Sequence, residues 1–460
     1  MNVLFCPLSN PGYLYPSIAV GLELQRRGAN VYVLGRANAA PRPAEAGLPF
    51  LAAEQYGGKG LFSVSQWPWR APDGQYLAVR RAAREVQADV LVTSLLCHEA
   101  LLAAETLDLP IVVIGLAAHL WTYQANGLGE PTKPVQREWR TRELLRFYCR
   151  AREQLGLPPR SSGRTDYPLT GTALLLRGDP VFEYPGAVLP ERVHHVGPCL
   201  WEPSAPPAEL EKIQSRLDRV GKPVVYVHLG RIFNGTDPWP RLNAAFTNGP
   251  FQAVVELGRS DNPRPEPDAD LVVVRNPWMG PLVDGAGLVL TSGTSAPVLN
   301  ALLRGRPLGV SPCGSEQPVL AEACVRAGVA MYVPNELNPS PLEVVRSAWH
   351  DRGLRARAVE LGKRLAAADG GGRAADIVQH AATGRTVGAG GAVRHIAAFQ
   401  VRKPLSTTRR RSPTMTEPGD KLPEPGDKLP EEDATPEVIA HGSEAILPCD
   451  GLCPTLGGEF

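Results

Sequence analysis

Short apolar runs alternate with helix-like segments in two successive series, and this pattern constrains the fold more than any other feature of the chain. The first series opens with the apolar residues 2–7 (NVLFCP), the helical spacing of Ser17–Arg27 and the apolar run Asn30–Leu34. Strand, loop, helix and strand in this order form the βαβ unit of a parallel sheet. The same alternation returns in three further segments, 89–93, 98–107 and 110–114.

A second series begins at residues 223–229 (PVVYVHL), after the Pro-rich stretch WEPSAPPAEL. Its other expected strands are 252–257, 271–274, 287–290 and 307–311, and its expected helices are 298–303, 318–327, 354–368 and 373–382. Two doubly wound, Rossmann-like α/β domains fit this layout. We predict an N-terminal domain over 1–203 and a C-terminal domain over 204–384, with the Pro-rich stretch as the linker between them.

The charge balance and the cysteines restrict the function classes. The 460 residues carry 48 Lys and Arg against 47 Asp and Glu, a net charge of +1, which predicts no bulk attraction to nucleic acid or to an anionic membrane. The first residues have no basic n-region and no long apolar stretch, and no apolar run reaches about 18 residues, so we expect neither a signal peptide nor a membrane span. Isolated cysteines in apolar contexts indicate a reducing, cytoplasmic environment. There is no Walker A, HExxH or CxxC motif, and neither a metal nor a cofactor is expected.

The segment TSGTSAPVLNAL (291–302) is the most promising site for an anionic ligand. It follows an expected strand, and Pro297 suits the first turn of a helix. Small hydroxylated residues and free backbone N–H groups at a helix N-terminus bind phosphate well. An ordinary capped helix without a ligand is the alternative.

Several motifs together give the chain a resemblance to the family 1 glycosyltransferases, over roughly residues 2–382. These are Trp278, the segment TSGTSAPVLNAL, Gly305-Arg306-Pro307, Glu316-Gln317, and the segments VHHVGPCLW, YVHLGR and DGGGRAADIVQ. The resemblance implies the GT-B fold, with two Rossmann-like domains. It also implies an inverting transfer of sugar from a nucleotide-sugar donor bound by the C-terminal domain to an acceptor bound by the N-terminal domain.

The resemblance also implies donor-binding residues. Trp278 would stack on the base, Gly230 would let its loop approach the diphosphate, and Arg231 would pair with it. The other implied donor residues are Ser292, Gly293, Thr294, Ser295, Asn300, Glu316 and Gln317. Ser292-Gly293-Thr294 replaces a His-Gly-Gly of the family, and Asn300 replaces a ribose-binding Glu. The alternatives are a core tryptophan at 278 and simple helix capping by Glu316 and Gln317.

The catalytic dyad of the family is absent. Tyr13 replaces the base histidine, and Ser94 replaces the partner aspartate. A tyrosine is a poor base near neutral pH, so His98, four residues after Ser94, is the preferred base, with Tyr13 and then His119 as further candidates. A surface or capping role is the alternative for His98.

Aromatic residues in two loops of the N-terminal domain are expected to line the acceptor cleft, with Trp67, Trp69 and Trp121 as its main contacts. Core packing is the alternative for them. The predicted function is transfer from a UDP- or TDP-sugar to a small-molecule or peptide acceptor in secondary metabolism, with a homodimer as a further possible assembly. Because the dyad is absent, a catalytically impaired homologue acting as an auxiliary binding subunit is the second hypothesis.

Residues 385–460 are expected to form a disordered tail. They are rich in Pro and Gly, contain EPGDKLP twice, and support no core. From Met415 onward the tail resembles the leader-plus-core layout of ribosomal precursor peptides. Ser443, Cys449, Cys453 and Thr455 are then potential attachment points, and a plain disordered extension is the alternative.

If the tail is a substrate, incubation with nucleotide sugars is expected to add the mass of a sugar within residues 443–460. Tethering would hold the tail at high effective concentration near the cleft. Intact-mass analysis and peptide mapping measure this. A constant mass, together with a tail-deleted variant that glycosylates a separate acceptor equally well, would contradict it.

Overall fold

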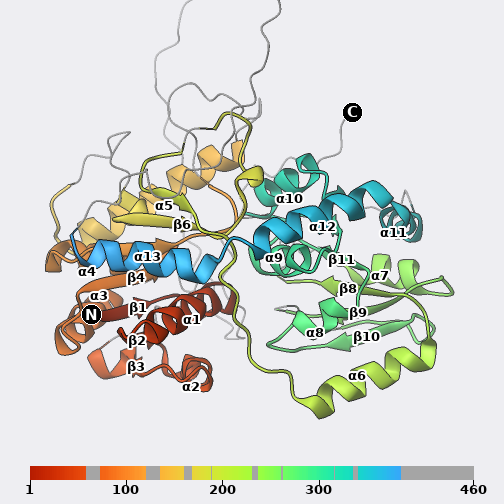
Figure 1. The fold of residues 1–460 in the computed structure, drawn as a ribbon, viewed down its shortest axis with the longest axis horizontal. Coiled ribbons are helices and arrows are strands. Elements are labelled where there is room, and N and C mark those ends of the chain that lie inside the picture. Colours follow the sequence, from red (N-terminus) through yellow and green to blue (C-terminus); the bar gives the residue numbers. More distant parts are fainter. Residues whose placement is uncertain are drawn as a thin grey trace, which may run out of the picture. The chain divides into compact units, whose positions relative to one another are not determined.

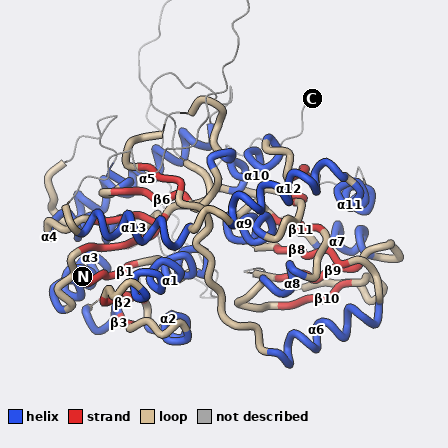
Figure 2. The backbone as a smooth tube through the Cα atoms, viewed as in Figure 1, coloured by secondary structure: helices blue, strands red, loops and turns tan. Residues whose placement is uncertain are grey.

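The computed structural model contains two parallel β-sheets with helices on both faces (Figures 1 and 2). It describes residues 1–57, 73–120, 135–159, 168–187, 189–230, 237–258, 260, 263–314, 316–334 and 340–384. The predicted layout of two Rossmann-like sheets is confirmed. Among the described helices, none combines the length and apolar character that a membrane crossing needs.

The N-terminal sheet has seven parallel strands in the order β3-β2-β1-β4-β5-β6-β7. The strands are β1 (Asn2–Cys6), β2 (Asn30–Gly35), β3 (Phe50–Ala52), β4 (Val90–Ser94), β5 (Ile111–Ile114), β6 (Ala173–Leu176) and β7 (Val193–His195). Its helices are α1 (Pro11–Arg26), α2 (Pro41–Glu45), α3 (Asp73–Glu85), α4 (His98–Leu107) and α5 (Val135–Gln154). The helix α1 begins six residues before the predicted Ser17, because Pro11 is well suited to a first helical position.

Both faces of this sheet are covered, which explains why β1 is a continuous apolar run. Val3 and Phe5 point into one core cluster, which contains residues of α1 such as Ile18. Leu4 and Cys6 point into the other, which contains residues of α3 and α4. Alternation of side chains along the strand therefore divides one short sequence between two cores.

The C-terminal sheet has six parallel strands in the order β10-β9-β8-β11-β12-β13. They are β8 (Val224–His228), β9 (Gln252–Glu256), β10 (Leu271–Val274), β11 (Leu288–Thr291), β12 (Leu308–Val310) and β13 (Ala330–Tyr332). Its helices are α6 (Pro207–Val220), α7 (Trp239–Phe246), α8 (Gly280–Asp284), α9 (Ser295–Leu303), α10 (Gln317–Arg326), α11 (Pro341–His350) and α12 (Arg352–Ala366). The order reverses between β8 and β11, and in doubly wound sheets such a switch point is where ligands bind.

The last described helix, α13 (Gly370–Ala382), packs against α1 and the N-terminal sheet (Figure 1). Its Ala374 and Val378 are fully buried in the same cluster as Val3. Arg27, the C-cap residue of α1, donates to Asp376 at 2.5 Å. The chain after α12 thus returns to the N-terminal sheet. From the sequence we predicted that residues 370–382 belong to the C-terminal domain.

Candidate functional site

Three glycines lie where neighbouring strands of the C-terminal sheet end. Gly230 follows β8, Gly258 follows β9 and Gly293 follows β11, with φ angles of 61°, 57° and 89°. A Cβ on Gly258 would lie 2.9 Å from the Cα of Gly230. A Cβ on Gly293 would lie 3.0 Å from the Gln317 carbonyl oxygen, so backbone conformation and close packing between the loops both require glycine at this sheet edge.

The helix α9 begins at this edge. Thr294 is its N-cap but makes no side-chain capping bond. Ser292 is 7 % exposed, and its Oγ has no hydrogen-bond partner among the described residues. The first N–H groups of a helix, beside a buried hydroxyl without a partner, form a favourable anion site.

Ser295, by contrast, already uses its hydroxyl within the protein. Its Oγ accepts a hydrogen bond of 3.1 Å from the backbone N–H of Ala117, in the segment after β5. This bond ties the start of α9 to the N-terminal part of the chain. A donor role for Ser295 stays a prediction, and its observed contact is structural.

Gln317 orders the loop before α10. Its Oε1 accepts hydrogen bonds from the backbone N–H groups of Cys313 (2.8 Å) and Gly314 (3.3 Å). The carbonyl of Gln317 lies 3.0 Å from the position that a Cβ on Gly293 would take, so this loop abuts the start of α9. Glu316 is the N-cap residue of α10, and its side chain makes no capping bond.

Gln317→Ala is expected to weaken binding of UDP or TDP by about 1–3 kcal/mol, because two loop N–H groups lose their acceptor. Isothermal titration of the parent and the variant measures the change. Gln214→Ala, at an exposed position of α6, is the control. Equal affinity in the parent and in both variants would show that the ordered loop is unnecessary for donor binding.

Two other predicted donor residues have partners or surroundings that differ from the expected ones. Asn300 is buried on α9, and its Oδ1 accepts from Arg304 at 2.7 Å. Trp278 is 1 % exposed and packs in a core cluster with Tyr226 and Leu282. Its Nε1 has no hydrogen-bond partner among the described residues. This environment fits the alternative of a core tryptophan better than an exposed stacking platform.

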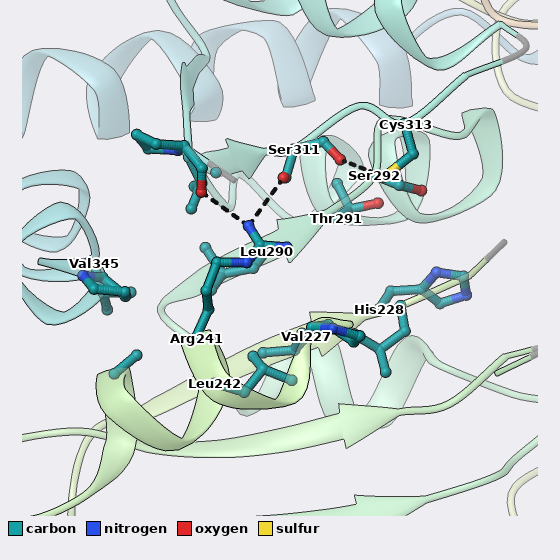
Figure 3. A pocket seen from close by; sticks show the side chains of 17 residues that line it. Val227, His228, Arg241, Leu242, Leu290, Thr291, Ser292, Ser311, Cys313 and Val345 are labelled. Atoms are coloured by element: carbon teal, nitrogen blue, oxygen red, sulfur yellow. Dashed lines mark hydrogen bonds between the residues drawn. The ribbon is translucent and has the colours of Figure 1, made fainter. Parts of the chain in front are cut away.

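A cavity of about 90 Å³ lies between the sheet, α7 and α11 (Figure 3). Arg241 crosses it and donates to the Pro334 carbonyl (2.8 Å) and to the Ser311 hydroxyl (3.4 Å). Figure 3 shows His228 at the end of its strand, on the side where Ser292 and Cys313 lie. The cavity therefore extends from α7 and α11 to His228 and Ser292 at the strand ends.

Two of the three predicted bases, His98 and Tyr13, lie at the carboxyl edge of the N-terminal sheet. Tyr13 is in the first turn of α1 and is partly buried. His98 is the first residue of α4 and is 2 % exposed, with its ring edge-on to Tyr148 at 6.1 Å between centroids. Burial lowers the pKa of His98 to about 3, which makes it a very weak base. The alternative of a structural histidine therefore suits His98 better than catalysis, although it is a buried rather than a surface one.

The sequence analysis did not identify Glu99 as a candidate, although its environment suits a general base. It lies in the first turn of α4, is partly buried, and burial raises its pKa to about 7. The Oγ of Ser94, the last residue of β4, accepts from the backbone N–H of Leu8 at 2.9 Å and so ties the loop after β1 to the end of β4. The only sequence signal for Glu99 was an acidic residue one position after His98, at a strand end.

Arg177 was also missed. It follows β6, is 1 % exposed, and donates to the carbonyls of Gly115 (2.7 Å) and Gly12 (3.5 Å). Its Nη1 has no hydrogen-bond partner among the described residues. Burial lowers its pKa, while Cys199, Tyr13 and Glu316 act to raise it, so the guanidinium lies within electrostatic range of Tyr13. The remaining predicted contacts, Arg231, Trp67, Trp69 and Trp121, lie outside the described residues.

The chain was compared with protein-family models and with curated proteins, and it is similar in sequence to known glycosyltransferases. No family model matches the chain. The NDP-glycosyltransferase YjiC of Bacillus subtilis is 26% identical over 197 residues, 41% of this chain and 48% of that protein. The zeaxanthin glucosyltransferase of Pseudescherichia vulneris is 24% identical over 327 residues, 65% of this chain and 76% of that protein. The matched region thus spans about half of the first relative and three quarters of the second.

Several solved structures have the same fold as this protein over most of the chain. The glycosyltransferase of kitacinnamycin has a TM-score of 0.64 at 21% identity, covering 83% of this chain and 98% of that one. The calicheamicin glycosyltransferase CalG4 has a TM-score of 0.61 at 22% identity, covering 84% and 99%. The chain is therefore a protein of the GT-B fold. The sequence resembles two known glycosyltransferases, as the motifs led us to expect, and the solved structures share its fold.

Proposed function

We propose that the protein is a nucleotide-sugar-dependent glycosyltransferase acting on a natural-product type of acceptor. The observation that carries the proposal is the glycine-lined edge beside the α9 N-terminus, at the switch point of the C-terminal sheet. A diphosphate leaving group would be stabilised there by backbone N–H groups and the helix dipole. Similarity to an NDP-glycosyltransferase, and to the fold of a solved homologue in complex with dTDP, supports this ligand class.

The reaction proposed is an inverting transfer. An acceptor hydroxyl, activated by a base, attacks the anomeric carbon from the face opposite the diphosphate; the C–O bond to the diphosphate breaks, and the base takes the acceptor proton. We place the base at the carboxyl edge of the N-terminal sheet, with Glu99 preferred over Tyr13 and His98. Its pKa of about 7 leaves a large fraction ionised near neutral pH.

Titration of the full chain with UDP and TDP tests the proposal, followed by a donor-hydrolysis assay with UDP- and TDP-sugars. Binding together with slow release of free nucleotide is expected. Binding without any turnover on sugar donors and acceptors would favour the auxiliary subunit instead. Absence of binding to both nucleotides would remove the proposed function altogether.

A further inference from the structure

The carboxyl end of β8 brings a histidine to the same point as Ser292. The His228 ring atoms Nδ1 and Cε1 lie 3.1 Å and 3.2 Å from the position that a Cβ on Gly230 would take. The Ser292 Oγ lies 3.5 Å from the same position. Because β8 and β11 are adjacent in the sheet, with His228 opposite Thr291, the two side chains border one small region above Gly230.

Both side chains carry buried polar atoms without partners. Among the described residues, neither the Ser292 Oγ nor the His228 Nδ1 has a hydrogen-bond partner beyond its own backbone. Burial lowers the pKa of His228 to about 4, so the ring is neutral at ordinary pH. Burying a polar group without a hydrogen-bond partner costs free energy. Such unpaired groups are expected at a site where a bound ligand supplies the missing hydrogen bonds.

The surroundings favour an anionic ligand. Because Gly230 has no side chain, none fills the space between His228 and Ser292, and Thr294, the N-cap of α9, follows Ser292 by two residues. Glu256, which lies opposite His228 on the adjacent strand β9, is already engaged, because its carboxylate accepts from the backbone N–H groups of Gly258 (3.0 Å) and Asn276 (2.8 Å). A hydroxyl, an imidazole and helix N–H groups together are suited to phosphate oxygens.

We propose that His228 and Ser292 jointly bind the terminal phosphate of the nucleoside diphosphate. This proposal rests on the proposed function and deepens it. The resemblance places a diphosphate-binding histidine at position 292, where this chain has serine. Here the imidazole comes instead from the adjacent strand, and the serine hydroxyl contributes the second contact. His228 is thus a donor-binding residue that the motif comparison does not identify.

Titration calorimetry of the full chain with UDP, UMP and uridine, repeated with TDP, TMP and thymidine, tests this assignment. His228→Ala and Ser292→Ala are each expected to weaken diphosphate binding about tenfold to a hundredfold, the scale for a hydrogen bond to a charged group. Binding of the nucleoside should be unchanged, since it lacks phosphate. His350→Ala, at an exposed position of α11, should leave all affinities unchanged.

A rescue experiment separates ligand contact from folding. Ser292→His in the His228→Ala background is expected to recover most of the diphosphate affinity, because it restores one imidazole near the same phosphate. Equal loss for diphosphate and nucleoside, or unchanged diphosphate affinity in a His228→Ala variant with the parent's melting temperature, would overturn the proposal. A parent chain that binds neither UDP nor TDP would instead refute the proposed function on which it rests.

Discussion

Glu99→Gln is expected to lower kcat by about 10²- to 10⁴-fold, the usual contribution of a general base. The amide keeps the size of the side chain but cannot take a proton from the acceptor. In the parent, kcat should rise with pH up to about 7 and then level off, because burial raises the pKa of Glu99 to about 7 and only its ionised form accepts a proton. The variant should lose this rise while donor affinity stays the same. Steady-state kinetics across pH 5 to 9 measure both.

Tyr13→Phe, His98→Ala and Glu360→Gln serve as comparisons, the last at an exposed position of α12. His98→Ala is expected to lower the melting temperature while leaving kcat near the parent's, because the ring packs against Tyr148. If Tyr13→Phe alone abolishes turnover and Glu99→Gln keeps the parent's pH profile, the phenol is the base.

Gly178→Ala is expected to destabilise the fold by about 3 kcal/mol, at the upper end of the range for an overpacked site. A Cβ at this position would overlap the carbonyl oxygen of Ala117 and approach the Phe182 ring to 2.7 Å. Neither the backbone nor a fully buried ring can move aside easily. Because the N–H of Ala117 also donates to Ser295, displacement of this segment should weaken nucleotide binding too.

Thermal unfolding and nucleotide titration of Gly178→Ala measure both effects. Gly285→Ala is the matched control, since its φ is −77° and the nearest atom to an added Cβ is 3.7 Å away. The same melting temperature in Gly178→Ala and in the control would show that the segment after β5 adapts freely.

The sequence by itself determined the class of fold. Apolar runs such as Val3–Cys6 reveal buried parallel strands, because both faces of such strands need apolar side chains. The helical spacing and the small residues from Ser292 onward predicted that a helix, α9, begins at the end of a strand. These are local properties of the chain, and local properties are the ones that a sequence pattern records.

Only the tertiary structure decided which side chains share a site. His228 and Ser292 are 64 positions apart, and strand pairing brings them to one point. Burial, which no pattern reports for a single position, separates His98 from Glu99 although they are adjacent in sequence. Burial also decides the role of Trp278. The motif predicts that this side chain stacks on the nucleotide base, but in the structure it packs in a core cluster. Long-range pairing and desolvation set these roles, and both depend on residues far away along the chain.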